Sequence, residues 1–178
     1  MQKEHSGSKW GTTGARYSGA QLLEFLSGRQ DIKTVLDFGA GKGTLGEYIT
    51  SRLPRIEWTN YDPGMPEYDR IPTKQFDCVV STDMLEHVEP DALESVLDVL
   101  SGLSRFVLYS DIACFPTGKV FGDGPYIGQD LHLIIKDPAW WREKFQRLTD
   151  LQELSYAHTE KLSKGVMKKR CILVHERA

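Results

Sequence analysis

The chain contains few cysteines, no long apolar run and little net charge. Its cysteines are Cys78, Cys114 and Cys171, which are far apart and form no C-x-x-C pair. They predict reduced thiols, and neither a disulfide framework nor a zinc site. No apolar run approaches the roughly 20 residues of a membrane span. A net charge of −3 gives no overall attraction to a phosphate backbone.

The polar first residues also lack the apolar core of a secretory signal. We therefore expect a cytoplasmic protein with no membrane partner. The 178 residues, of which 40% are hydrophobic and 26% charged, suit a single globular domain over residues 1–178.

One stretch organises the chain: residues 34–44, TVLDFGAGKGT. Its first half is a short apolar run with a carboxylate at Asp37, which is typical of a central strand buried on both faces. Gly39, Gly41 and Gly43 follow, and a helical pattern begins directly after them. A strand, a glycine turn and a helix let a cofactor contact bare backbone at a helix N-terminus.

Several ligands could use such a loop. A mononucleotide phosphate loop requires Gly-Lys-Ser/Thr, but Lys42 is followed by Gly43, so this interpretation fails. A dinucleotide fingerprint would need its third glycine at Thr44, which weakens a nicotinamide oxidoreductase without excluding it. The remaining form, Asp-x-Gly-x-Gly-x-Gly, begins at Asp37. A glycine turn that binds no ligand is the alternative.

A second carboxylate follows the next predicted strand. Residues 56–62 read as a strand that ends at Asp62. A carboxylate at that position can accept hydrogen bonds from both hydroxyls of a ribose. Asp37 and Asp62 would lie at the carboxyl ends of adjacent parallel strands, where open α/β sheets bind ligands. The alternatives are that Asp37 caps a helix and that Asp62 begins a turn.

The segment after Asp62 is unusual for such a fold. Residues 63–75 contain three prolines and a glycine, so they are too short and too broken for a helix and a strand. The sheet is therefore expected to be shortened there. A buried strand follows at residues 76–83, and the string DMLEHV begins at Asp83.

The glycine motif and the DMLEHV string together resemble motifs of the class I S-adenosylmethionine (SAM)-dependent methyltransferases that act on small molecules, over residues 34–112. The resemblance implies SAM as cofactor and S-adenosylhomocysteine (SAH) as product. It implies a Rossmann-like, doubly wound α/β/α fold with a mostly parallel sheet, shortened around its third strand and ending in an antiparallel strand.

The resemblance also implies a set of cofactor-binding residues. Around the methionine end these are Asp37, Gly39, Ala40, Gly41 and Gly43. Asp62, followed by Pro63, would bind the ribose. Thr82, Asp83 and Met84 would line the methionine and adenine parts.

The flanking segments predict the cover of the site. By the same resemblance, residues 1–30 would form an N-terminal lid and helix. Ser18 and Gln21 suit a capping box at the start of the helix. Trp10 and Tyr17 would cover the cofactor, or alternatively pack the helix onto the sheet. Residues 112–137 are predicted to form a substrate loop, because a loop of this length in a compact domain is usually functional. A helix capped by Asp137 follows, and then a hairpin of residues 151–159 and 166–175 joined by residues 160–165.

The expected activity is methyl transfer to an oxygen or nitrogen of a small molecule or modified nucleotide, by a monomer or homodimer. If the acceptor must lose a proton, His132, His87 or Asp111 could serve as the base. A purely structural role is the alternative for both histidines. No set of metal ligands is predicted.

Two other functions are left open. Methylation of a nucleic acid is supported only by a basic cluster of Lys164, Lys168, Lys169 and Arg170. The cluster reads mainly as a solvated face, and the alternative is that it touches an anionic substrate or a nucleic acid. The other is a SAM-binding or SAM-cleaving protein that transfers nothing.

Overall fold

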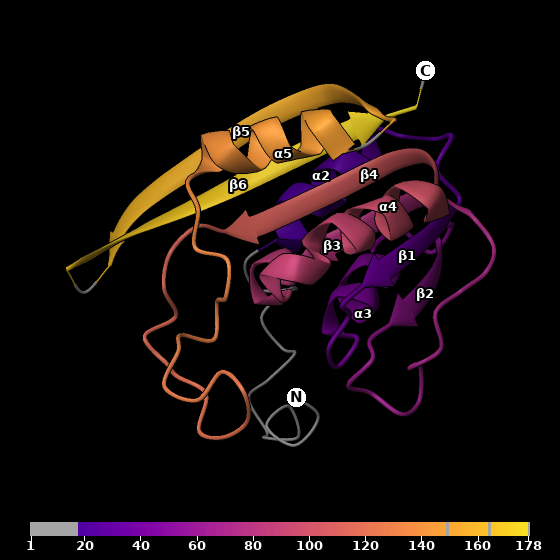
Figure 1. Cartoon of the computed structure of the whole chain (residues 1–178). Coiled ribbons are helices and arrows are strands. Elements are labelled where there is room, and N and C mark those ends of the chain that lie inside the picture. The colour runs from indigo at the N-terminus through magenta and orange to yellow at the C-terminus, as the bar shows by residue number, and fades with distance from the viewer. Residues whose placement is uncertain (1–17, 149, 164, 178) are drawn as a thin grey trace.

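The computed structural model describes residues 18–148, 150–163 and 165–177. Six strands form one sheet in the order β2-β1-β3-β4-β6-β5. They are β1 (Thr34–Phe38), β2 (Glu57–Tyr61), β3 (Phe76–Thr82), β4 (Ser104–Ala113), β5 (Gln152–Ser163) and β6 (Val166–Glu176). The first four strands are parallel, whereas β6 runs antiparallel to both β4 and β5 (Figure 1). The prediction of a mostly parallel sheet with a reversed end is confirmed.

Helices cover both faces of the sheet (Figure 1). One cluster of buried side chains joins α4 (Leu93–Leu103) and α5 (Pro138–Leu148) to the sheet, and a second joins α2 (Gly19–Ser27) and α3 (Thr44–Thr50) to its other face. Neighbouring strand residues alternate between the two clusters, as the two-residue period of a strand requires: Leu36 and Val35, Val79 and Val80, Leu108 and Val107, Leu173 and Val174. The predicted three-layer architecture is confirmed.

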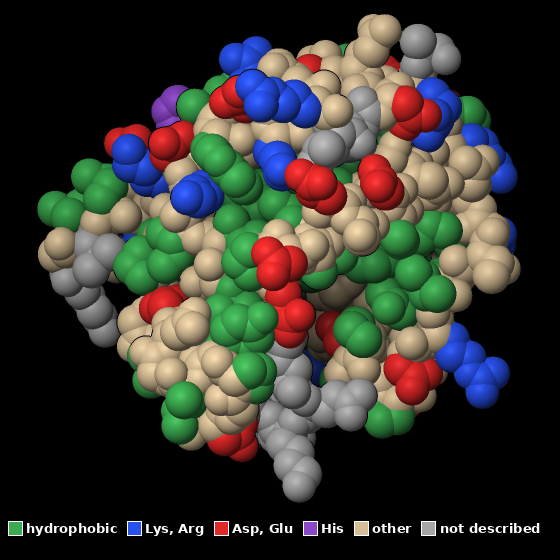
Figure 2. Space-filling view, viewed as in Figure 1, with side chains coloured by type: hydrophobic (Ala, Val, Ile, Leu, Met, Phe, Trp, Pro, Cys, Tyr) green, Lys and Arg blue, Asp and Glu red, His purple; other side chains and the backbone are tan. Residues whose placement is uncertain are grey.

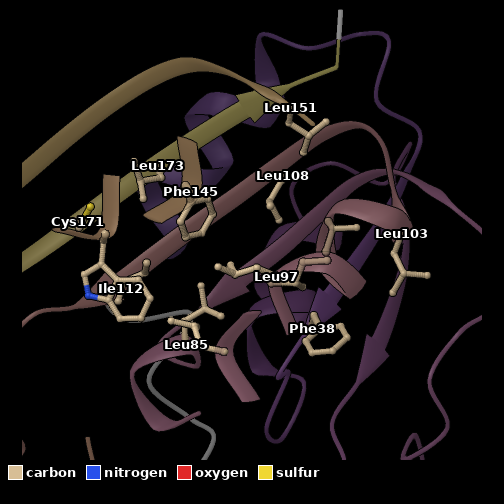
Figure 3. Packing of buried hydrophobic residues seen from close by; sticks show 14 of the residues in the cluster. Phe38, Leu85, Leu97, Leu103, Leu108, Ile112, Phe145, Leu151, Cys171 and Leu173 are labelled. Carbon is tan, nitrogen blue, oxygen red and sulfur yellow. The ribbon is translucent and has the colours of Figure 1, made fainter. Parts of the chain in front are cut away.

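Large apolar side chains anchor the helices to the sheet. Figure 3 shows Leu97 of α4 and Phe145 of α5 pointing toward Leu108 of β4. All three are fully buried, as is Trp141 of α5. Burial of each such side chain contributes roughly 1.5–3 kcal/mol, so this layer fixes the position of α5 and of the loop that precedes it. Among the described residues, no helix has the length and apolar character needed to cross a membrane.

The shortened region of the sheet is confirmed. Residues 62–75 connect β2 to β3 through turns and bends, without a helix or strand. Two 3-10 helices, η1 (Leu85–His87) and η2 (Pro90–Ala92), follow β3 and lead into α4. The predicted N-cap of α5 is also present, since the Trp140 amide donates to Asp137 Oδ1 at 2.9 Å.

Two local predictions are wrong. Ser18 does not form a capping box, because its hydroxyl donates to the Asp111 carboxylate at 2.5 Å instead of to the first turn of α2. The terminal hairpin is longer than predicted: β5 continues to Ser163 and pairs with β6 up to Val166. Residues 160–163, mostly polar, were read as part of the connecting loop, but a solvated hairpin tolerates polar side chains on both faces.

Candidate active site

A cavity of about 920 Å³ lies at the carboxyl ends of the parallel strands. Its wall combines the glycine loop after β1, the turns after β2 and β3, the long loop after β4, and part of the β5–β6 hairpin. The face drawn in Figure 2 is hollowed near its centre, with acidic side chains at the border of the recess. This is the sheet edge at which open α/β folds bind ligands.

The glycine loop needs its glycines for two physical reasons. Gly39, Gly41 and Gly43 have φ values of 90°, 55° and 72°, a region that other residues rarely adopt. In addition, a Cβ atom on Gly39 would lie 2.3 Å from Met84 Cγ. The turn after β1 therefore touches the turn after β3, which no larger residue would allow.

The carboxylate of Asp62 holds the glycine loop. Its Oδ2 accepts a hydrogen bond from the Gly41 amide at 2.8 Å, and its Oδ1 accepts one from the Gly64 amide at 2.8 Å. The Tyr61 carbonyl accepts from the amides of Gly39 and Ala40 at 2.8 and 3.1 Å. Asp62 lines the cavity, and its two oxygens keep lone pairs that could accept hydrogen bonds from a ribose. The ribose contact itself stays a prediction.

Asp37 is the most unusual group of the site. Its side chain lines the cavity and is 1% exposed, and within the described structure neither carboxylate oxygen has a hydrogen-bond partner. Burial raises the pKa of Asp37 to about 7, and the negative charge of Asp62 adds to the rise. A buried acid without a partner is costly, so the site is suited to a ligand that brings positive charge.

The turn after β3 is fixed by an ion-pair cluster. Asp83 has a φ of 49°, its amide donates to the Asp111 carbonyl at 3.0 Å, and its Oδ1 lies 2.7 Å from Nη1 of Arg170. Arg170 also binds the Asp111 carboxylate, with Nη2 at 2.8 Å from Oδ1. Arg170 therefore belongs to the cavity wall, and its interpretation as part of a solvated face is wrong.

Asp111 lies behind this wall. It is 1% exposed, its two oxygens bind Arg170 and Ser18, and it is absent from the residues that line the cavity. This placement gives Asp111 a positioning role for Arg170 and Asp83. Its role as a base stays an untested prediction.

The two predicted histidines meet at the other end of the cavity. The rings of His87 and His132 form an edge-to-face pair with centroids 4.7 Å apart. Nδ1 of His132 lies 2.5 Å from the Phe115 carbonyl oxygen, and Nδ1 of His87 lies 2.9 Å from that of Leu131. Because a carbonyl only accepts, each Nδ1 carries the proton and each Nε2 has the lone pair. Burial lowers the pKa of His132, which favours its neutral form.

Glu86 completes this end of the site. It is fully buried; its Oε1 accepts from the Ala113 amide at 3.0 Å and lies 4.0 Å from Nε2 of His132. Its Oε2 has no hydrogen-bond partner within the described structure. Burial raises the pKa of Glu86 to about 8, and the charge of Asp83 contributes to the rise.

The structure brings together most of the predicted site. The predicted residues that line the cavity are Asp37, Gly39, Ala40, Gly41, Asp62, Pro63, Thr82, Asp83, Met84, His87 and His132. Gly43 is absent from the lining and instead shapes the turn, where a Cβ would lie 2.7 Å from Asn60 Nδ2. Trp10, Tyr17 and most of the predicted lid lie outside the described residues.

Sequence reasoning missed the part of the wall that comes from distant segments. This part includes Lys119 and Lys161, which no prediction singled out, and Lys168, which was read mainly as part of a solvated face. The lysines come from the long loop and from both strands of the hairpin. No local motif identifies them, because their proximity depends on how far β5 and β6 extend. Only the length of the loop gave a signal. Several residues of 112–137 line the cavity, and their role as a substrate loop stays a prediction.

The comparisons with known proteins agree with this geometry. A family model described as a methyltransferase domain matches residues 13–112. Since the match spans more than half of the 178 residues, the chain belongs to this methyltransferase domain family. The predicted family is thereby confirmed.

Solved structures with the same fold point in the same direction. One is the 1,6-didemethyltoxoflavin-N1-methyltransferase of Burkholderia thailandensis with bound SAH, with a TM-score of 0.65 and 18% identity over 96% of this chain and 81% of that one. Another is the magnesium protoporphyrin IX methyltransferase of Synechocystis PCC 6803 with bound SAH, with a TM-score of 0.65 and 13% identity over 93% and 84% of the two chains. Both agree with the predicted fold and cofactor.

One curated relative matches a shorter stretch. The catechol O-methyltransferase 1 of Solanum lycopersicum is 32% identical over 73 residues, which cover 36% of this chain. The chain spans only 20% of the length of that relative.

Proposed function

We propose that this protein is a SAM-dependent methyltransferase that methylates an oxygen or nitrogen atom of a small molecule or modified nucleotide. The observation that carries the proposal is Asp37, a buried carboxylate beside the glycine loop that lines the cavity. Among the described residues, neither of its oxygens has a hydrogen-bond partner. The methionine part of SAM offers an ammonium group, and its sulfonium adds a second positive charge. Such a ligand supplies the charge that Asp37 lacks.

The other predicted cofactor residues have matching chemistry. Gly39 and Gly41 line the cavity and place backbone at its wall. Asp62, already anchored by two amides, would accept hydrogen bonds from the ribose hydroxyls. Thr82 and Met84 would contact the remainder of the cofactor from the turn after β3. Family membership and the SAH-bound structures of the same fold support this choice of ligand.

The reaction needs alignment more than covalent help from the protein. The sulfonium already makes the methyl carbon electrophilic, so the acceptor atom attacks this carbon while the carbon–sulfur bond breaks and SAH leaves. Holding the two reactants in line contributes roughly 7–11 kcal/mol in favourable cases. The rigid turns of the cofactor end and the long loop of the acceptor end would provide this alignment.

A hydroxyl acceptor must also lose a proton. Both predicted histidines line the cavity with a lone pair on Nε2. We favour His132, because burial lowers its pKa and thus keeps it neutral and able to accept a proton. His87 lies against it, edge to face. Asp111 is the least suited, since it lies behind the wall.

The acceptor end also favours negative charge. Lys119, Lys161 and Lys168 line the cavity on this side, and Lys168 Nζ lies 5.0 Å from the centre of the Phe115 ring. A carboxylate or phosphate on the acceptor would complement them. This feature suits a metabolite or a nucleotide.

Calorimetric titration with SAM, SAH and NAD tests the cofactor directly. We expect both adenosyl ligands to bind and NAD not to bind. Asp37→Asn should weaken SAH binding at least tenfold, whereas Asp98→Asn, at an exposed position on α4, should leave it unchanged. Absence of SAH binding by the wild-type protein would refute the proposal. Turnover of SAM without any acceptor would instead support the SAM-cleaving alternative.

A further inference from the structure

We propose that Glu86, His87 and His132 bind a divalent transition-metal ion at the acceptor end of the cavity. One potential ligand atom from each side chain lies within 4.8 Å of the other two. Glu86 and His87 come from η1, and His132 comes from the loop after β4. The inference rests on the proposed function, because it assigns the ion a role in methyl transfer.

Both histidines are oriented as metal ligands are. A ligating histidine nearly always donates its other ring nitrogen to a carbonyl or carboxylate, which fixes the tautomer and the ring plane. Here Nδ1 of His87 donates to the Leu131 carbonyl at 2.9 Å, and Nδ1 of His132 donates to that of Phe115 at 2.5 Å. The two Nε2 atoms therefore have the lone pairs that an ion requires.

Glu86 provides the negative charge. Its side chain is fully buried, and its Oε2 has no hydrogen-bond partner within the described structure. Its Oε1 lies 4.0 Å from Nε2 of His132 and is held by the Ala113 amide at 3.0 Å. A carboxylate that is buried, oriented by backbone and still short of a partner is suited to coordinate a cation.

The distances between the ligand atoms indicate that the side chains rotate toward one another when the ion binds. Ligands about 2.0 Å from a tetrahedral zinc ion lie about 3.3 Å apart, so the outermost atoms here must approach one another by rotation of the side chains. The backbone around His132 is already fixed, since Asp130 Oδ1 accepts from the His132 amide at 2.9 Å and from the Thr117 amide at 3.0 Å.

The ligand types select the ion. Two imidazoles and one carboxylate match Zn²⁺, Fe²⁺, Co²⁺, Ni²⁺ or Mn²⁺, whereas Mg²⁺ and Ca²⁺ prefer oxygen ligands. Three protein ligands leave at least one coordination position open. Because His87 and His132 line the cavity, an ion between them would present that position to the acceptor.

The ion would act as a Lewis acid on an acceptor hydroxyl. Coordination lowers the pKa of the hydroxyl, and its proton passes to water. The metal-bound oxygen then forms a bond to the methyl carbon as the carbon–sulfur bond breaks, which yields the methyl ether and neutral SAH. Nε2 of His132 cannot bind the ion and accept this proton at the same time, so the ion replaces His132 as the activating group. The proposal thus selects oxygen over nitrogen as the acceptor atom.

Local sequence patterns could not predict this site. Glu86 and His87 are adjacent, but His132 is 45 residues beyond His87 and follows a long loop. Two ligands and one distant histidine match no metal-binding spacing.

The test is metal binding by the full-length protein after removal of ions with a chelator. Zn²⁺ is titrated by calorimetry, and Co²⁺ is followed by its visible d–d absorption. We expect one ion per chain and a loss of affinity of at least a hundredfold for His132→Ala and for Glu86→Gln. His158→Ala, which removes an exposed histidine of β5, is the matched control and should bind as the wild type does.

SAH binding is measured on every variant, since the cofactor residues do not include these ligands. A protein that binds SAH but no Zn²⁺ or Co²⁺ would overturn the metal site and leave the proposed function intact. Equal affinity of the wild type, His132→Ala and Glu86→Gln for Zn²⁺ would overturn it as well. Loss of SAH binding by the wild type would instead refute the proposed function.

Discussion

The two ends of the cavity are built in different ways. The proposed cofactor end consists of three short turns that directly follow β1, β2 and β3. Backbone bonds and the Asp62 carboxylate join the first two turns, and an ion pair with Arg170 fixes the third. The acceptor end combines η1, the loop after β4 and the β5–β6 hairpin, which are far apart in the sequence and meet through side chains. Recognition of the cofactor is therefore local and rigid, whereas recognition of the acceptor depends on long-range assembly.

This difference indicates that the acceptor end can change its residues more readily than the cofactor end can. Loops that are positioned by a rigid scaffold can change without loss of the fold. A substitution at one end of the cavity should consequently leave the function of the other end nearly unchanged. The predictions below test this separation.

The largest effect is expected at His132. On an acceptor found by screening for SAH release, His132→Ala should lower kcat by about 10²–10⁴-fold, the usual contribution of acceptor activation. The dissociation constant of SAH should change by less than about threefold, because His132 is not among the predicted cofactor-binding residues. A threefold change corresponds to less than about 1 kcal/mol. Steady-state kinetics and calorimetry measure the two effects, with His158→Ala as control. A comparable loss of SAH affinity would show that the two ends are coupled.

Substitution of one glycine at each end of the cavity tests how tightly the two ends are packed. Gly39→Ala combines a φ of 90° with a 2.3 Å approach to Met84, so we expect it to lower the free energy of unfolding by about 2–5 kcal/mol and to weaken SAH binding. Gly118→Ala in the acceptor loop has a φ of 74° but no atom within 4 Å of the new Cβ. It should cost only about 1–2 kcal/mol. Equal effects in chemical denaturation would contradict the proposed difference in packing.

The acceptor loop has its own anchor at Asp130. Its carboxylate accepts hydrogen bonds from the amides of Thr117, Gly118 and His132. Asp130→Ala leaves these amides without their partner, so we expect the free energy of unfolding to fall by about 1–3 kcal/mol and KM for the acceptor to rise. Asp123→Ala, an exposed change in the same loop, is the control. An altered KM for SAM with an unaltered KM for the acceptor would place Asp130 at the wrong end.

The smallest effect is expected at the rim. If the acceptor is anionic, Lys168→Gln should raise its KM about two- to fivefold, because an exposed ion pair contributes roughly 0.2–1 kcal/mol. The ratio of the KM of Lys168→Gln to the KM of the wild type, both for the acceptor, should fall toward one as salt is added. A ratio that does not depend on salt would exclude an electrostatic role for this lysine.

The sequence predicted the local structure of the glycine loop well because its signals are contiguous. The run from Asp37 to Gly43 contains the strand end, the positive φ positions and the helix start, and each has a local cause. The shortened sheet also followed from the prolines after Asp62.

Contacts between segments that are distant in the sequence could not be predicted to the same depth. Arg170 was read as a solvated residue, because its pairing with Asp83 and Asp111 arises only when β6 lies beside β4. Ser18 was read as a helix cap, because its actual partner, Asp111, is 93 residues away. The polar end of β5 gave no strand signal, since both of its faces are largely exposed.

We propose that Asp37, whose carboxylate has no hydrogen-bond partner among the described residues, binds the cationic end of the cofactor. The effect of its ionisation on stability has a definite sign. The pKa of Asp37 is raised from 3.8 to about 7, so between these values the folded protein holds more protons than the unfolded one. Ionisation of Asp37 therefore destabilises the ligand-free protein as the pH rises through this range, by up to about 4 kcal/mol. Asp37→Asn removes this cost.

The decisive measurement is thermal unfolding of the wild type and Asp37→Asn at pH 5 and pH 8, with and without SAH. We predict that the ligand-free Tm of the variant exceeds that of the wild type by more at pH 8 than at pH 5, because most of the cost of Asp37 appears between these values. At pH 8, SAH should raise the Tm of the wild type more than that of the variant. If the variant has the wild-type pH profile and an equal response to SAH, Asp37 is not the group that binds the cofactor.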